Sequence, residues 1–336
     1  MKRAARDELL ATLADGELHS GAALAARLGL SRTAVWKLVA ELKGIGVAIG
    51  SVERRGYRLA QACELLREEL IRAAAVEAGT PLPGELEVLF EVDSTNEYLY
   101  AADVPRPGAP RVVFTELQRA GRGRRGRSWL APFGSGLTFS VAWSYAEVPA
   151  DLAALGLALG VQVAEALRDE GVVEVRLKWP NDIVWRQRKL GGLLLQLRLE
   201  AGGAACVVAG LGLNLTLPDG MRDQLEASGA APVADVRDAL GGRVPRRNRL
   251  AGRLAGALCA GLERFGREGF SPFAERWRRL DALDGAMVRV IHSGGSTDGR
   301  SLGADRDGAL LVEVNGRTER FLAGDVSLRA GGSSPG

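Results

Sequence analysis

Residues 115–129 read TELQRAGRGRRGRSW, and this stretch decides how the chain is organised. Five arginines and three glycines fall between Arg119 and Arg127. A segment without apolar periodicity forms neither a core helix nor a half-buried strand. Its glycines let the backbone approach a ligand, and its guanidinium groups can bind phosphate or carboxylate through paired hydrogen bonds. The stretch therefore predicts a loop that binds an anion.

Other interpretations of this loop stand beside that one. Gly121, Gly123 and Gly126 have the spacing of a dinucleotide fingerprint, which must follow a strand and open a helix. Residues 111–114 (RVVF) predict the strand, but residues 128–134 (SWLAPFG) do not begin a helix. A phosphate loop is disfavoured for the same reason. A solvated basic run that binds nucleic acid non-specifically stays open.

Composition limits the class of protein. A chain of 336 residues, 46% hydrophobic and 25% charged, predicts a globular protein of two or three domains. The longest apolar run, residues 152–164, is too short to span a bilayer, so we expect a cytoplasmic protein without a membrane partner. Three separated cysteines and two histidines argue against a disulfide framework and a histidine-based metal site.

The N-terminal segment predicts a winged helix-turn-helix. Helices are expected at residues 7–18, 22–28 and 32–43, with Ser20 and Ser31 as N-caps of the last two, and a hairpin at residues 47–59. Residues 1–60 hold ten Lys and Arg against six Asp and Glu, whereas the remainder holds 34 against 35. This excess favours a polyanionic partner. A small helical protein-interaction module is the alternative.

The expected DNA contacts lie on the third helix and at the tip of the hairpin. They are Ser31, Arg32, Thr33, Lys37, Arg54 and Arg55. Trp36 is expected in the core or at an interface rather than at a base.

The rest of the chain predicts an α+β fold, with helices on one face of a mixed sheet. Strands are expected at residues 85–92 and 137–145, a helix at 151–170, an antiparallel meander at 172–215, helical structure at 248–278, and four or five short strands at 283–329.

Five blocks in a fixed order carry a family resemblance. They are DSTN (93–96), the arginine loop, KWPND (178–182), RKLGG (188–192) and GLGLN (210–214). Together with the N-terminal segment they resemble the bifunctional biotin–protein ligase and biotin-operon repressor. The resemblance covers residues 8–329. It implies a winged helix at residues 1–62, a biotin ligase catalytic domain at 63–278 and an SH3-like barrel at 279–330.

The resemblance also implies an activity. Biotin and ATP would form biotinyl-5′-AMP with the help of Mg²⁺, and the biotinyl group would pass to a lysine of a biotin carboxyl carrier protein, a subunit of acetyl-CoA carboxylase. Operator DNA and a second copy of the chain, in a ligand-linked homodimer, are the other implied partners. A related lipoate–protein ligase and a ligand-sensing repressor without ligase activity are the alternatives.

Motif position carries the family's functional residues onto this chain. The implied catalytic residues are Lys189, Arg124, Lys178 and Asp182, and Asp182 is also the implied Mg²⁺ ligand. The implied biotin and adenylate contacts are Ser94, Thr95, Asn96, Gln118, Arg122, Gly123, Arg124, Lys189 and Asn214. Simple capping by Ser94 and simple turn roles for Lys189 and Asp182 are the alternatives. Leu193 and Leu195 are expected to form an apolar wall for biotin.

This sequence departs from the family pattern after Asn214. Repressor-type ligases carry an aromatic residue there that stacks on adenine, but no Phe, Trp or Tyr occurs between Leu213 and Phe265. We expect residues 216–236 to be mobile without ligand, because they hold few large apolar anchors. Aliphatic side chains would then cover the adenine, and the candidates are Leu215, Leu217, Met221 and Val233. The alternative is that Trp129 or another distant aromatic residue takes that place.

Overall fold

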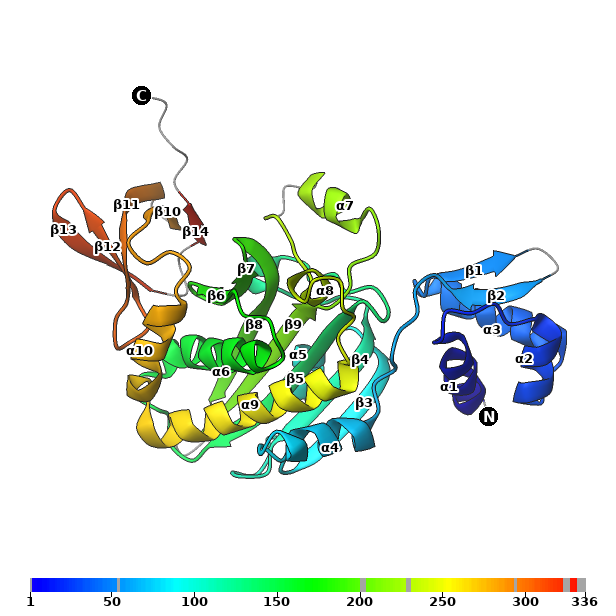
Figure 1. The fold of residues 1–336 in the computed structure, drawn as a ribbon. Coiled ribbons are helices and arrows are strands. Elements are labelled where there is room, and N and C mark those ends of the chain that lie inside the picture. The colour runs from blue at the N-terminus through cyan, green and yellow to red at the C-terminus, as the bar shows by residue number, and fades with distance from the viewer. Residues whose placement is uncertain are drawn as a thin grey trace.

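The computed structural model describes residues 2–52, 55–199, 204–227, 231–292, 295–322 and 327–330. Three parts follow one another along the chain, as Figure 1 shows. An N-terminal module of helices and a hairpin stands at one end, a seven-stranded sheet forms the centre, and a five-stranded sheet follows. The α+β class and the order of the three parts agree with the prediction.

The N-terminal module is a winged helix-turn-helix. Its elements are α1 (Lys2–Leu13), α2 (Gly21–Leu28), α3 (Arg32–Gly44), β1 (Ile49–Val52) and β2 (Gly56–Leu59). Ser20 and Ser31 cap α2 and α3 as predicted, each accepting a hydrogen bond at 3.1 Å from a backbone N–H three residues on. The wing joins the helices because Tyr57 N–H donates to His19 O at 2.9 Å.

The central sheet has the strand order β3-β4-β5-β9-β8-β7-β6. The strands are β3 (Glu85–Val92), β4 (Arg111–Gln118), β5 (Gly136–Tyr145), β6 (Val175–Lys178), β7 (Asp182–Trp185), β8 (Arg188–Leu199) and β9 (Ala205–Asn214). Only β3 and β4 run parallel; the other neighbours, including the predicted meander from β6 to β9, are antiparallel. The predicted mixed sheet is therefore confirmed.

Helices cover the two faces of this sheet unequally. The main core lies on the face covered by α4 (Glu68–Glu77), α6 (Leu155–Asp169) and α9 (Arg247–Glu268), which Figure 1 shows side by side. The short helix α5 (Thr95–Tyr100) lies on the other face, where Leu99 packs with Val113, Ala142 and Val208. The prediction of helices on one face alone is wrong, because the six-residue helix α5 covers part of the other face and buries Leu99 there.

A buried ionic clamp holds the segment that leads from the N-terminal module into the central sheet. Glu116 in β4 and Arg247 in α9 form an ion pair of 2.8 Å, and both side chains are almost fully buried. Glu116 Oε1 accepts the Leu66 N–H at 2.6 Å, and Arg247 donates to Glu64 O at 2.5 Å. A buried pair of this kind requires such extra hydrogen bonds to offset its desolvation.

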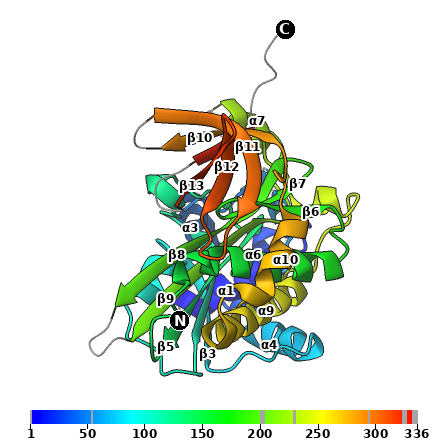
Figure 2. The same ribbon diagram turned by 90° about the vertical axis from the view of Figure 1, so that its left-hand side faces the viewer.

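The C-terminal part packs closely against the centre, and its buried side chains belong to the same main hydrophobic core. Helix α10 (Ser271–Leu280) leads into β10 (Met287–His292), β11 (Gly295–Ala304), β12 (Leu310–Val314), β13 (Arg317–Phe321) and β14 (Ser327–Ala330), an antiparallel sheet that lies above α6 and α10 in Figure 2. The turn between β11 and β12 reaches the central sheet, since Trp179 Nε1–H donates to Gly308 O at 3.0 Å. The five strands fulfil the prediction for residues 283–329.

Two short helices, α7 (Met221–Ala227) and α8 (Val236–Ala239), interrupt the segment after β9. Within the described ranges, every helix is too short or too polar to cross a membrane.

Candidate biotin and adenylate site

The arginine loop closes on itself at one end of the central sheet. Trp129 N–H donates to Gly121 O at 2.8 Å, and Gly123 N–H donates to Arg127 O at 2.7 Å. Arg125, at the tip, has a φ of 58°, a left-handed conformation that an arginine adopts only in a tight turn. Hydrogen bonds from the start of the loop to the end of β3 fix its base. The loop therefore has a defined shape, although it carries no regular secondary structure beyond one 3₁₀ turn.

Small residues form the floor beneath this loop. Gly192 in β8, Gly212 in β9 and Thr138 in β5 are cross-strand neighbours, and Gly210 lies two residues before Gly212 on the same face. A Cβ on Gly210 would lie 2.0 Å from Asn96 Oδ1, and a Cβ on Gly212 would lie 2.4 Å from Cε2 of the Trp129 ring. The glycines are required because α5 and Trp129 lie directly on the sheet.

A cluster of short polar side chains occupies one end of the floor. Gln118 Oε1 accepts hydrogen bonds from Thr95 N–H at 2.8 Å and from Thr95 Oγ1 at 3.2 Å. Ser140 Oγ lies 2.7 Å from Thr95 Oγ1 and 2.6 Å from Asn96 Oδ1. Ser94 caps α5 by accepting the Glu97 N–H. Closely spaced donors and acceptors of this kind suit a polar, uncharged ring such as an amide or a urea.

Cationic side chains gather toward the other end. Lys189 Nζ lies 2.6 Å from Asp182 Oδ1, and Lys178 is the cross-strand neighbour of Asp182. Arg124 Nη1 approaches Asn181 Oδ1 at 3.5 Å. Burial is the main cause that lowers the pKa of Arg124, and the neighbouring Arg125 lowers it further. The guanidinium keeps its charge at neutral pH, so this end of the floor attracts an anion.

The two remaining residues of the implied site have structural partners. Arg122 is exposed and pairs with Glu97 on α5 at 3.0 Å. Asn214 faces the floor, but its Nδ2 donates to Ala234 O at 3.1 Å and so holds the segment after residue 230 against the sheet. Asn96 Nδ2 likewise donates to Leu194 O at 3.1 Å. Within the described chain, no group of three or more His, Cys, Asp or Glu residues could hold a metal ion by itself.

One expectation about the floor is wrong. Leu193 is part of the main core, and Leu195 lies against Gly156 of α6, on the face of the sheet opposite the arginine loop. Leu194 points to the loop face instead, because its partner across the strands is Gly210. Three consecutive leucines carry no alternation, so only the pairing with β9 determines which of them faces the site.

Of two further residues at the site, Ser140 was not predicted, and Trp129 was considered only as a substitute for the missing adenine-stacking aromatic. For Ser140, polar residues at alternate positions 138 and 140 of an apolar strand were a usable signal. Trp129 covers Gly212, and its indole Nε1 is buried without a hydrogen-bond partner in the described part of the protein. The pattern of the loop gave no indication that this ring would fold back onto β9.

The segment 216–236 is better anchored than expected. Leu217 and Val233 are buried, and Lys189 N–H donates to Pro232 O at 2.7 Å. The buried carboxylate of Asp235 accepts the Leu217 N–H at 2.8 Å and a hydrogen bond from Arg222 at 2.8 Å. The expectation of few anchors is wrong for both ends of the segment.

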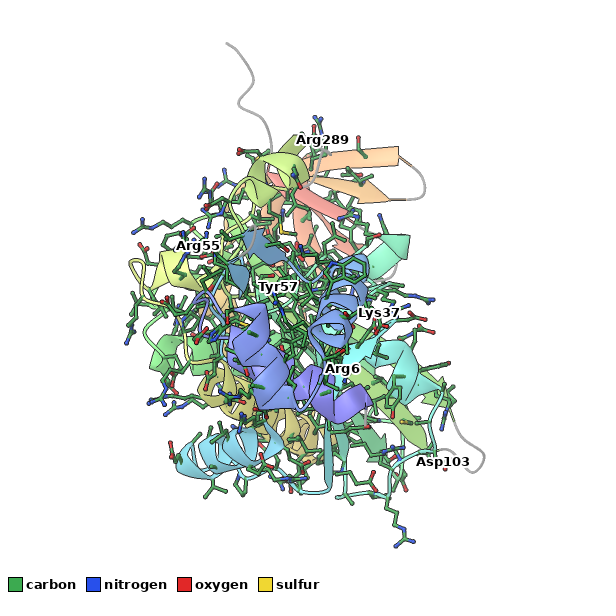
Figure 3. The ribbon with its side chains drawn as sticks, turned by 90° about the vertical axis from the view of Figure 1, so that its right-hand side faces the viewer. Arg6, Lys37, Arg55, Tyr57, Asp103 and Arg289 are labelled. Atoms are coloured by element: carbon green, nitrogen blue, oxygen red, sulfur yellow. The ribbon has the colours of Figure 1, made fainter. Side chains whose placement is uncertain are left out.

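The expected DNA contacts lie on the surface of the N-terminal module. Ser31, Arg32, Thr33 and Lys37 of the α3 region are exposed, as is Arg55 on the wing. Figure 3 shows Lys37 and Arg55 on either side of Tyr57. Arg54 lies outside the described residues. Trp36 is 58% exposed, so the expectation of a core position is wrong, and the alternative of an interface position stays a prediction.

Comparisons with known proteins agree with this architecture. Family models match in chain order: "HTH domain" at residues 6–58, "Biotin/lipoate A/B protein ligase family" at 89–214 and "Biotin protein ligase C terminal domain" at 285–329. The chain is similar in fold to the biotin protein ligase from Aquifex aeolicus in complex with biotin and ATP, with a TM-score of 0.61 and 26% identity over 74% of this chain and 99% of that one.

Full-length relatives narrow the class. The bifunctional ligase/repressor BirA of Salmonella typhimurium is 38% identical over 325 residues, which are 96% of this chain and 97% of that protein. The biotin–[acetyl-CoA-carboxylase] ligase of Mycobacterium tuberculosis is 33% identical over 78% of this chain and 95% of that protein. This chain belongs to the family of the bifunctional biotin ligase/repressors.

Proposed function

We propose that this protein attaches biotin to a carrier protein with ATP and represses transcription through its winged helix. The observation that carries the ligase half is the floor beneath the arginine loop, with a neutral polar cluster at one end and a cationic cluster at the other. Biotin has a matching shape, since a neutral ureido ring lies at one end and a carboxylate at the other. Family membership and the domain order support the same conclusion.

The polar cluster would hold the ureido ring. Thr95 lies within hydrogen-bond distance of both Gln118 and Ser140. A ureido ring that took over these hydrogen bonds would keep the hydroxyl and amide groups satisfied. Asn96 acts by positioning, since its amide fastens α5 to β8. Leu194, which points to the loop face, would contact the apolar part of biotin.

The cationic cluster would bring two anions together. In the first half-reaction a biotin carboxylate oxygen attacks the α-phosphorus of ATP, and the bond to the pyrophosphate oxygen breaks. Lys189, Lys178 and Arg124 place fixed positive charge where the phosphoryl oxygens gain charge. Mg²⁺ would neutralise further phosphate charge. The Asp182 carboxylate, which pairs with Lys189 at 2.6 Å, would supply one ligand to an ion whose other ligands are waters and substrate phosphates.

The second half-reaction transfers the biotinyl group. The amine of an acceptor lysine attacks the carbonyl carbon of biotinyl-5′-AMP, an amide bond forms, the bond to the phosphate oxygen breaks, and AMP leaves while the amine loses a proton. A mixed anhydride requires protection from water. The arginine loop and the segment 218–227 are the elements that could close over it, and a biotin carboxyl carrier protein is the acceptor we propose.

We also propose operator DNA and a second copy of the chain as partners, and a cytoplasmic location. Operator DNA would bind the exposed basic residues of α3 and the wing, and ligand binding would favour a homodimer. A cytoplasmic location suits both the acceptor and the DNA.

One experiment tests the ligase proposal against a lipoate ligase. The purified protein is given ATP, Mg²⁺ and either biotin or lipoate, with the isolated biotin carboxyl carrier domain as acceptor, and the acceptor is weighed by mass spectrometry. We expect one biotinyl group per acceptor domain and no lipoyl transfer. Lipoyl transfer at an equal rate would refute the choice of substrate, and no transfer of either would favour a ligand-sensing repressor.

A further inference from the structure

The exposed tryptophan on α3, Trp36, is not needed to fill the core of the N-terminal module. Trp36 is 58% exposed, whereas Trp143, Trp179 and Trp277 are at most 6% exposed. The buried side of α3 is already filled by Val35, Val39 and Leu42. An indole left in water forgoes the large burial energy that tryptophan normally contributes. A partner that covers Trp36 is therefore the natural reason for its position.

The surroundings of Trp36 indicate the chemistry of that partner. Thr33, Trp36 and Ala40 are exposed and lie at i, i+3 and i+7, which places them along one line of the helix. Arg32 and Lys37 flank this line and are also exposed, and the first turn of α3 holds no acidic residue. This line of side chains, with a cation on each side, would suit a polyanion that presents apolar groups between its negatively charged groups.

We propose that Trp36 reads thymine in the major groove of the operator, through apolar contact with the 5-methyl group. The proposal rests on the DNA-binding half of the proposed function. The thymine methyl is the apolar group that base pairs present in the major groove, and an α-helix fits that groove. The N-terminal half of a recognition helix is the part that meets base edges, and Trp36 is the fifth residue of α3.

This assignment separates the roles of the helix residues. Arg32 and Lys37 contact phosphates and set affinity for any duplex, with the salt dependence that such contacts bring. Trp36 sets preference among sequences, with the Thr33 methyl group beside it. The half-site must then contain a thymine opposite Trp36, and removal of its methyl group must matter only while the indole is present.

The test uses the full chain with biotin and ATP. A preferred site is first selected from randomised duplexes, and each thymine of that site is then replaced singly by deoxyuridine, which removes only the methyl group. Wild type, Trp36→Ala and Trp36→Phe are compared by titration. Leu70→Ala is the matched control, because it truncates another exposed apolar side chain on a helix of the central part.

We expect deoxyuridine at one or more positions to weaken wild-type binding about fourfold, the effect of one buried methyl-sized group. Trp36→Ala should bind the selected site roughly tenfold more weakly, similar to the loss from one mismatched base pair, and should no longer distinguish thymine from uracil there. Trp36→Phe should keep part of the preference, and Leu70→Ala should match wild type. Biotin adenylation should be unchanged in all variants.

Two results would overturn the proposal. One is Trp36→Ala protein that binds the selected site as tightly as wild type. The other is weaker binding with an unchanged ratio of thymine to uracil affinity, which would make Trp36 a general contact or a contact between copies of the chain. Wild-type protein that selects no sequence at all would refute both this assignment and the DNA-binding function, and so differs from a failure of Trp36 alone.

Discussion

Removal of the Lys189 side chain should separate catalysis from stability. The lysine Nζ lies 2.6 Å from Asp182, and both side chains are about a quarter exposed, at 28% and 26%. An ion pair near the surface contributes less than about 1 kcal/mol. The backbone of Lys189 also bonds to Pro232 and Ala234, and Lys189→Ala leaves those bonds in place. The variant should therefore fold with little loss of stability.

The effect on catalysis should be much larger. If Lys189 stabilises charge that develops on the phosphoryl oxygens, loss of that contact should cost about 2–4 kcal/mol in the transition state. This corresponds to a fall in the rate of pyrophosphate release of roughly 30- to 900-fold. The neighbouring Arg188, the first residue of the same strand β8, is exposed and supplies a matched control.

The assay measures pyrophosphate release with saturating biotin and ATP for wild type, Lys189→Ala and Arg188→Ala, with a thermal melt of each. We expect a large fall for Lys189→Ala alone and nearly equal melting temperatures. A fall of less than about tenfold, roughly 1.4 kcal/mol, would refute the role of Lys189. An equal fall for Arg188→Ala would also refute it, because loss of any positive charge near the site would then slow the reaction equally.

Stability, closure over the ligand and the role of the N-terminal module can each be tested. Burial raises the pKa of Asp281 to about 6 from 3.8, so its contribution to stability is present at low pH and is lost as pH rises through 6. Asp281→Asn should therefore flatten the fall in melting temperature from about pH 4 to 7. An unchanged slope in the variant would contradict this. Hydrogen exchange of residues 218–227 should slow when biotin and ATP are added, while residues 233–235 stay protected throughout; equal exchange of residues 218–227 in both states would argue against closure. Deletion of residues 1–60 should abolish DNA binding and leave biotin adenylation, and a truncated protein that still shifts operator DNA would count against the domain assignment.

Local signals in the sequence predicted much of the fold. Ser20 and Ser31 cap helices where short-range chemistry places them, and the strand at residues 85–92 has the bounds that alternation predicted. The arginine loop was recognised because its composition excludes regular structure. The domain boundaries near residues 62 and 278 stay predictions.

Features that depend on contacts between residues far apart in the sequence could not be predicted from local patterns. The face to which Leu194 points depends on its register with β9, and a run of leucines does not encode it. Trp36 stands among apolar residues of α3, so periodicity did not distinguish an exposed indole from a buried one. The Glu116–Arg247 clamp joins residues far apart in sequence, and no local pattern marks such a pair.

Formation of biotinyl-5′-AMP by the purified protein is the direct test of the proposed ligase activity. The protein is incubated with biotin, ATP and Mg²⁺, and with each substrate omitted in turn. Native mass spectrometry then measures the mass of the chain together with any bound ligand. We expect one biotinyl-5′-AMP per chain, formed only when biotin and ATP are both present and strongly reduced in Lys189→Ala. Wild-type protein that binds biotin but forms no adenylate with ATP would contradict the proposed ligase activity.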